Sequence, residues 1–352
     1  MIRSWSTVKR AGVALAALAL VASPTVGASA APVAPGATDL RQLRGTVTVD
    51  GSSTVFPISE AMAEEFQKQT NGNVRVTVGI AGTGGGFKKF CAGETDISNA
   101  SRPISKSEIE QCKSAGIEFV ELPVAFDGLS VMVSPQNDFV TSMTVAELKA
   151  LWQPAAQGTI TKWSQIRPDW PDREFRLYGP GADSGTFDYF TEAINGTAKA
   201  SRGDYTASED DNVLVQGIAN DPDALGYFGF AYYEENADKL KLVAVDGGNG
   251  PVLPSEETIK GGTYTPLSRP LFIYAKKTSL DKPEVLEFLK FHLNPNSAPV
   301  LINQVGYIAF PGEYYDYGLQ RMAALQTGTV FGGAAKLGTT LADLYSGTPT
   351  VP

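Results

Sequence analysis

The feature that most constrains this chain is a regular alternation of strand-like and helix-like segments. Residues 46–50 and 74–80 alternate apolar and polar side chains, as half-buried strands do. A helix-like segment follows each of them, at 52–70 and at 82–93. Because this order repeats along the chain, we expect an α/β fold in which helices cover the faces of a sheet.

The same pattern continues to the C-terminal part of the chain. It predicts strands at 119–126, 128–135, 174–180, 225–236, 239–245 and 269–276, a short strand and loop at 95–105, and helices at 105–116, 144–152, 211–221 and 282–293. Gly116 is the expected stop of one helix, and Thr144 with Glu147 has the spacing of a capping box. The segment after Gly328 is rich in glycine and threonine, and we expect it to be peripheral.

Three of the strand-to-helix turns share one composition, glycine together with hydroxyl side chains. They lie at 52–57, 82–86 and 183–186. A helix N-terminus leaves N–H groups unpaired and favours an oxyanion, and glycine lets the backbone come close. Ser and Thr are also ordinary helix caps, which is the alternative for each turn alone. Such turns gather at the carboxyl ends of strands, so three of them together predict one small anion site.

One cation and one carboxylate accompany these turns. Arg102 follows Ser101 in the loop after a short strand, and its planar guanidinium suits phosphate or carboxylate. A surface salt bridge is the alternative role. Asp183 lies beside Ser184, where it can orient Arg102 or accept a proton from a ligand. Its alternative role is that of an ordinary turn-forming residue.

Two familiar catalytic or nucleotide motifs are incomplete. The segment 82–89 lacks the Gly-Lys-Ser/Thr ending of a P-loop, which argues against a nucleotide site. A secreted serine hydrolase using Ser184 remains an alternative, but the single histidine, His292, follows that serine and lies in an apolar helix. A phosphatase lacks a supporting metal cluster. We therefore expect no enzyme activity, no metal and no cofactor.

The N-terminus has the three parts of a secretory signal peptide. A basic region precedes a short apolar run, and Ala28–Ala30 is a small-residue cleavage site. The apolar run is too short to span a bilayer. We expect residues 1–30 to be removed, 31–44 to be a loose lead-in, and the protein to be periplasmic or secreted. The formal net charge of −9 argues against nucleic acid and anionic membranes as partners.

The chain has two cysteines, Cys91 and Cys112. In an oxidising compartment such a pair is expected to form a disulfide, and two buried thiols are the alternative. With one histidine in the sequence, a Cys/His zinc site is not expected.

Four segments in this order and spacing resemble the PstS family, the phosphate-binding proteins of bacterial ABC importers. The segments are 50–58, 79–90, 96–105 and 179–190, and the likeness spans roughly residues 45–330. It is closest to the soluble, non-lipidated, SphX-like branch with an Ala-Ser-Arg-Pro loop. The resemblance implies a two-lobe periplasmic binding protein of type II, a Venus flytrap with discontinuous lobes and a hinge. It also implies phosphate as ligand, ABC permease subunits as partners, and a monomer.

Carried over by position, the resemblance implies a set of phosphate-binding residues. They are Thr54, Val55 and Phe56 in the first turn, Thr83 in the second, and Ser184, Gly185 and Thr186 in the third, with Ser101, Arg102 and Asp183 as candidates beside them. The chain departs from the family at two positions. Ser101 stands where members have a proton-accepting Asp, and Pro180 stands where members have an Arg. Arg102 and Asp183 are the expected replacements.

The resemblance also implies the domain organisation. We expect residues 45–123 and 269–330 to form lobe 1, 124–268 to form lobe 2, and 331–352 to be a C-terminal tail. The predicted function is high-affinity binding of inorganic phosphate outside the cytoplasmic membrane and delivery to an ABC-type permease. A receptor for another tetrahedral oxyanion and the serine hydrolase are the alternatives.

Overall fold

The computed structural model describes residues 39–182, 184–208, 210–334, 340–347 and 349. The predicted signal peptide and Asp183 lie outside the described residues. Within them, no helix combines the length and the apolar character that a membrane crossing would require.

The described residues form alternating strands and helices, as the sequence pattern predicts. The strands are β1 (Gly45–Gly51), β2 (Val74–Val78), β3 (Ile97–Ala100), β4 (Phe119–Val133), β5 (Ser142–Thr144), β6 (Arg176–Gly179), β7 (Thr206–Ala207), β8 (Ala224–Gly229), β9 (Lys241–Asp246), β10 (Pro251–Val252), β11 (Ser268–Lys276) and β12 (Ile308–Ala309). The helices are α1 (Phe56–Gln69), α2 (Gly82–Cys91), α3 (Lys106–Ser114), α4 (Val145–Trp152), α5 (Gly185–Phe190), α6 (Asp211–Ala219), α7 (Phe230–Glu234), α8 (Glu256–Lys260), α9 (Pro283–His292), α10 (Ala298–Gln304), α11 (Gly312–Ala323) and α12 (Leu341–Ser346).

The strands form a mixed sheet with the order β2-β1-β3-β11-β4-β8-β6-β7. β1 runs parallel to β2 and β3, whereas β11 is antiparallel to β3 and β4. On the other side of β4, β8 is antiparallel to β4 and parallel to β6. Two groups of parallel strands are thus joined by an antiparallel centre, and we call them the first strand group (β1, β2 and β3) and the second strand group (β6, β7 and β8).

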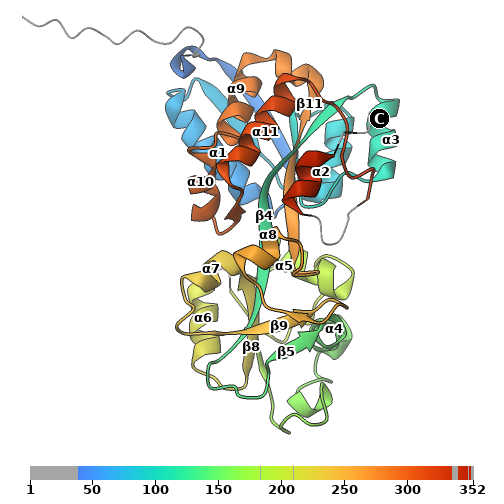
Figure 1. Ribbon diagram of the computed structural model, residues 1–352, viewed down its shortest axis with the longest axis vertical. Coiled ribbons are helices and arrows are strands. Elements are labelled where there is room, and N and C mark those ends of the chain that lie inside the picture. The colour runs from blue at the N-terminus through green and yellow to red at the C-terminus, as the bar shows by residue number, and fades with distance from the viewer. Residues whose placement is uncertain (1–38, 183, 209, 335–339, 348, 350–352) are drawn as a thin grey trace, which may run out of the picture. The chain divides into compact units, whose positions relative to one another are not determined.

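β4 and β11 connect the two strand groups (Figure 1). The first ten residues of β4, up to Gly128, pair with β11, and from Leu129 onward β4 pairs with β8 and β9. The sequence predicted two strands here, 119–126 and 128–135, and that prediction is wrong. Asp127 and Gly128 resemble a turn in the sequence, but both stay in the ladder because β11 offers them partners.

Two other sequence predictions also need correction. The segment 225–236 is not one strand, because the ladder ends at Gly229 and the chain turns into α7. The beginning of the C-terminal segment, at Thr329 and Val330, is not peripheral. Thr329 and the amide of Val330 donate to the buried carboxylate of Glu121, at 2.6 and 3.0 Å. Since a buried carboxylate requires hydrogen-bond donors, Thr329 and Val330 belong to the core around β4.

The predicted caps and the predicted disulfide are present. Thr144 and Glu147 form a capping box at α4, and Gly116 follows α3 in the left-handed conformation, with φ of 71°. Cys91 of α2 is bonded to Cys112 of α3, so the prediction of a disulfide is confirmed. Of the predicted lead-in, residues 31–38 lie outside the described residues, and Leu43 is buried against the core.

Candidate functional site

A cavity of about 210 Å³ lies where the loops after the parallel strands meet α5 and β11. It is smaller than the ~300–1,000 Å³ pockets that hold drug-sized ligands, which suits a small ion. It is lined by Ser52, Ser53, Thr54, Gly82, Thr83, Gly84, Ser101, Arg102, Asp188, Tyr189, Glu192, Ala198 and Arg269. Five serine and threonine side chains, one tyrosine and two arginines therefore surround one small space.

The topology of the first strand group explains why these residues meet. β1 is paired in parallel with β2 on one side and with β3 on the other. The carboxyl ends of parallel strands lie at the same edge of a sheet, so the loops that follow them are neighbours. Those loops carry Ser52–Thr54, Thr83 and Ser101, so two of the three turns that the sequence predicted to converge line this cavity.

Ser52, Ser53 and Thr54 of the first turn line the cavity, and Ser52 Oγ accepts from the amide of Val55 at 3.4 Å. α1 has no side-chain cap. Thr54 is buried, and its Oγ1 donates to the carbonyl of Gly185 at 3.2 Å and accepts from Arg269 Nη2 at 3.1 Å. Val55 and Phe56 do not line the cavity, and the amide of Phe56 donates to the carbonyl of Ser52 at 3.0 Å. Of the three residues predicted in this turn, Thr54 therefore has the side chain in the site.

The second turn and the loop after β3 form a pair of hydroxyls. Thr83 Oγ1 and Ser101 Oγ are 3.0 Å apart, and the amide of Ser101 donates to Thr83 Oγ1 at 3.2 Å. α2, like α1, has no side-chain cap. The alternative that these residues are ordinary helix caps does not apply to Thr83, whose hydroxyl is held at the cavity wall by Ser101.

The third turn plays a different part from the first two. Ser184 is the cap of α5, accepting a hydrogen bond from the amide of Thr186 at 3.2 Å. Gly185 is packed so closely on the first turn that an added Cβ would lie 2.5 Å from Thr54 Cα. None of Ser184, Gly185 and Thr186 lines the cavity. The turn instead brings the second strand group against the first. The rest of α5 supplies Asp188 and Tyr189 to the cavity, and the π-helical turn that follows, Thr191–Asn195, supplies Glu192.

Arg102 lines the cavity, but its guanidinium is already paired with a carboxylate. Its two terminal nitrogens donate to the two oxygens of Glu108, each at 2.8 Å. Burial raises the pKa of Glu108, but the hydrogen bonds from Arg102 and Ser105 outweigh burial and hold that pKa below its usual range. The surface salt bridge considered from the sequence is thus present, although Glu108 is largely buried and also belongs to the capping box of α3.

The second arginine of the cavity, Arg269, was not among the residues predicted from the sequence. Its side chain is 13% exposed, and its guanidinium carbon lies 3.4 Å from the centre of the Tyr189 ring. Its carboxylate neighbours are distant, with Asp127 at 3.5 Å and Glu192 at 3.6 Å. The sequence predicted a strand at 269–276, and an arginine at the start of an otherwise apolar strand was the signal that could have drawn attention to it.

The strand partner of Arg269 is a buried carboxylate. Asp127 lies directly opposite Arg269 in the β4–β11 ladder and is 4% exposed. Burial raises the pKa of Asp127 to about 6, and the charge of Arg269 offsets only part of that effect. The ion pair between them is long, and neither Asp127 Oδ2 nor Arg269 Nε has a hydrogen-bond partner among the described residues.

The arrangement does not support the hydrolase alternative. His292 is 1% exposed in α9, and neither ring nitrogen has a hydrogen-bond partner in the described part of the chain. Burial lowers the pKa of His292 to about 4. A general base must reach the proton that it removes. Ser184 is therefore not paired with a histidine, and its position as a helix cap accounts for it.

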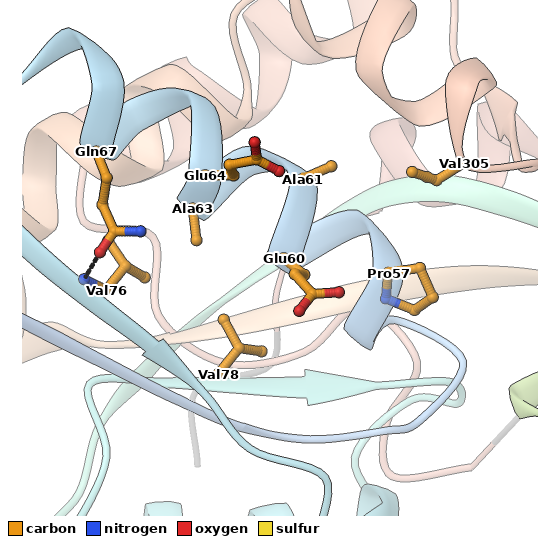
Figure 2. A pocket seen from close by; sticks show the side chains of 9 residues that line it. All are labelled: Pro57, Glu60, Ala61, Ala63, Glu64, Gln67, Val76, Val78 and Val305. Atoms are coloured by element: carbon orange, nitrogen blue, oxygen red, sulfur yellow. Dashed lines mark hydrogen bonds between the residues drawn. The ribbon is translucent and has the colours of Figure 1, made fainter. Parts of the chain in front are cut away.

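A second, larger hollow of about 450 Å³ is lined by acidic side chains instead of basic ones. It lies over α1 and β2 and is lined by Glu60, Glu64 and Gln67 together with apolar side chains (Figure 2). The carboxamide oxygen of Gln67 accepts from the amide of Val76 at 3.1 Å. Two carboxylates without a cation in the lining would repel an anion, so this hollow is not the predicted site.

Comparison with known proteins agrees with the motifs. A model of the PBP superfamily domain matches residues 34–296. The protein SphX of Synechocystis is 50% identical over 304 residues, which are 86% of this chain and 90% of the relative. The phosphate-binding protein PstS of Staphylococcus saprophyticus is 39% identical over 284 residues, which are 80% of this chain and 85% of the relative.

A solved structure gives the same result. A possible phosphate-binding protein from Planctomyces limnophilus is 51% identical, with a TM-score of 0.77, and the match covers 80% of this chain and 99% of that one. The predicted α/β periplasmic-binding-protein fold and the resemblance are thereby confirmed. The chain belongs to the PBP superfamily and, within it, to the family of the PstS and SphX proteins.

Proposed function

We propose that this protein binds inorganic phosphate in the cavity between the two strand groups and delivers it to an ABC-type permease. The observation that carries the proposal is the set of hydroxyls around Arg269, in a chain whose relatives include named phosphate-binding proteins. Hydroxyls and an arginine are donors, and a small anion with several oxygens needs many donors in a confined space.

Both arginines of the cavity have carboxylate neighbours, so we expect hydrogen bonds, and not net positive charge, to hold the anion. Arg102 is paired with Glu108, and Arg269 is shared between Asp127 and Glu192. Ligand binding then depends on Thr54, Thr83 and Ser101 together with the less engaged arginine. Charge-assisted hydrogen bonds net about 1.5–3 kcal/mol each, and a micromolar complex needs roughly 8 kcal/mol. Several such bonds therefore suffice for micromolar binding, even after the cost of desolvating the anion is subtracted.

The proposal includes the two lobes and the hinge that the resemblance implies. We assign residues 45–123 and 269–330 to lobe 1 and 124–268 to lobe 2, with β4 and β11 as the crossing strands. The contact of Gly185 with Thr54 joins the two lobes, so phosphate entry requires these turns to separate. Bending at a pair of crossing strands is a common way for binding proteins to open and close.

The remaining parts of the proposal come from the family. The mature chain acts outside the cytoplasmic membrane as a monomer, after removal of residues 1–30, and it is a receptor without enzyme activity. Val55, Phe56, Ser184, Gly185 and Thr186 act through their backbone and by holding the closed arrangement. Asp183 remains a predicted ligand contact.

Titration calorimetry of the ligand-stripped mature protein with phosphate tests the proposal. We expect one-to-one binding that is micromolar or tighter. Replacing Thr83 by Val and Ser101 by Ala removes the hydroxyl pair and should weaken binding by roughly 100-fold, at about 1–2 kcal/mol for each lost donor. Ser114→Ala is the matched control, because that exposed hydroxyl lies on α3 and bonds to the carbonyl of Glu110. Absence of heat with phosphate would refute the proposed function.

A further inference from the structure

The chain beyond α11 returns to the central strands of the sheet. The amide of Gly328 donates to the carbonyl of Phe119 in β4 at 2.9 Å. The buried ring of Phe331 packs edge-on against Phe272 of β11, with 5.3 Å between the ring centres. We call residues 328–333 the docked segment. The proposed function gives this segment no role, although it is anchored to both crossing strands.

A chain of buried hydrogen bonds runs from the docked segment to the loop after β3. Thr329 Oγ1 and the amide of Val330 donate to the carboxylate of Glu121, at 2.6 and 3.0 Å. The hydroxyl of Tyr274 donates to the same carboxylate at 2.7 Å and accepts from the amide of Ile104 at 2.9 Å. Each of these polar groups is therefore satisfied by the next one in the chain of hydrogen bonds.

Water cannot replace the partners in this chain of hydrogen bonds. Glu121 is 1% exposed, and Tyr274 and Ile104 are fully buried. Burial raises the pKa of Glu121, and the hydrogen bonds that it accepts oppose that shift. A buried donor or acceptor that loses its partner bears the full cost of desolvation. A displacement of one group therefore displaces the next one as well.

The loop at the far end of these hydrogen bonds belongs to the anion cavity. Ile104 closely follows Ser101 and Arg102, which both line the cavity. Ser101 Oγ lies 3.0 Å from Thr83 Oγ1, so the position of this loop also sets the geometry of the hydroxyl pair. The ring of Pro103 fixes one backbone angle between Arg102 and Ile104, which leaves the loop little freedom to absorb a shift.

A second contact holds the other end of the same loop. The amide of Lys106, the first residue of α3, donates to the carbonyl of Gly333 at 3.2 Å. This bond satisfies one of the amides that a helix N-terminus leaves unpaired. An added Cβ on Gly333 would lie 2.6 Å from Lys106 Cγ. The docked segment therefore reaches the 101–105 loop on both flanks.

We propose that the docked segment is a positioning element of the anion site, which holds the 101–105 loop in place through Glu121, Tyr274 and Gly333. This inference rests on the proposed function of phosphate binding. These residues act on the ligand through the loop and do not touch it, because none of them lines the cavity. Phosphate affinity then depends on a segment that is distant from the site in the sequence.

Calorimetric titration with inorganic phosphate compares Tyr274→Phe with Tyr264→Phe. The first variant removes the hydroxyl that joins Glu121 to Ile104, and we expect phosphate affinity to fall by roughly 10-fold. The hydroxyl of Tyr264 is also buried, but it has no hydrogen-bond partner among the described residues. Its loss should leave the affinity within about twofold of wild type.

Two neighbouring glycines offer a matched pair within the docked segment. Gly332 and Gly333 both have positive φ, at 65° and 84°. An added Cβ meets Lys106 at Gly333 but meets nothing within 4 Å at Gly332. Both alanine variants share the strain of a positive φ. We expect Gly333→Ala to bind phosphate at least about threefold more weakly than Gly332→Ala, because only the first disturbs the contact with the loop.

Three further readouts separate positioning from a loss of stability. Val285→Ala shortens a buried side chain of α9 and should lower Tm without changing phosphate affinity. Thr329→Val removes the hydroxyl donor and should weaken binding, whereas Thr329→Ser keeps the donor and should retain wild-type affinity. Hydrogen exchange at the Ile104 amide should become faster in Tyr274→Phe and stay slow in Tyr264→Phe.

The outcomes distinguish this inference from the proposed function. Wild type that binds no phosphate refutes the proposed function, and the inference falls with it. Wild type that binds phosphate, with Tyr274→Phe and Gly333→Ala at unchanged affinity, overturns the inference alone. Equal losses of affinity in Tyr274→Phe and Val285→Ala would mean that the docked segment contributes only stability, which also overturns the inference.

Discussion

Two arginines line the cavity, and their surroundings differ in almost every respect. Arg102 lies on a loop, is 34% exposed, and is bound through two nitrogens by Glu108 at 2.8 Å. Arg269 lies in the crossing strand β11, is 13% exposed, and has Asp127 and Glu192 at 3.5 and 3.6 Å. The first arginine is satisfied by its own partner, whereas the second retains donors for a ligand.

The difference shows that residue type and position beside a motif do not reveal whether an arginine is already paired with a carboxylate. A bidentate pair uses the geometry that an arginine would otherwise offer to an oxyanion. A partly buried arginine with long ion pairs is incompletely compensated, so an incoming anion gains more from it. We therefore expect Arg269 to contribute more to phosphate affinity than Arg102.

Arg269→Gln should have the largest effect. We expect phosphate affinity to fall by at least about 100-fold, because a partly buried charge is lost from the ligand site. The variant also leaves Asp127 buried without a cation, which costs about 3 kcal/mol of stability. Calorimetry measures the first effect and urea unfolding the second. Arg269→Lys keeps the charge and should bind more tightly than Arg269→Gln, and equal affinities of these two variants would contradict the charge argument.

Asp127→Asn should remove a pH dependence of stability. The raised pKa of about 6, against an ordinary value of 3.8, means that the folded protein holds this proton more tightly than the unfolded chain. The unfolding free energy from this group therefore falls as pH rises from about 4 to about 6, by up to roughly 3 kcal/mol. Urea unfolding at pH 4 to 7 should show a flatter profile in the variant. An unchanged slope would indicate that Arg269 compensates Asp127 as fully as Glu108 compensates Arg102.

Arg102→Gln should affect stability more than binding. Glu108 would lose two hydrogen bonds while staying largely buried, which we expect to cost about 1–2 kcal/mol after allowing for the exposure of Arg102. Phosphate affinity should fall by less than about tenfold. A loss as large as that of Arg269→Gln would reverse the proposed ranking of the two arginines.

Glu108→Gln should produce the smallest change, and in the opposite direction. Releasing Arg102 from its carboxylate makes that arginine available to the anion, and we expect phosphate affinity to rise about threefold. Glutamine can still serve in the capping box of α3, so the helix should be retained. Decreased affinity in a folded variant would mean that Glu108 orients Arg102 for binding.

Much of the fold and part of the site followed from local sequence. Alternation of strands and helices, the capping box at Thr144, and the pair Cys91–Cys112 depend on neighbouring residues or on simple chemistry, and the structure contains all of them. The hydroxyls of Thr54, Thr83 and Ser101 could be predicted to converge because parallel strands end at one edge of a sheet.

The features that the local sequence did not predict depend on pairing with residues distant in the chain. Asp127 and Gly128 continue a strand because β11, about 140 residues later, pairs with them. Thr329 and Val330 are core residues because Glu121 needs donors. Local patterns in the chain were enough to predict the family, the fold class and the hydroxyl-rich turns. Which arginine lacks a close carboxylate partner became visible in the folded structure, because charge compensation is set by pairing between distant segments.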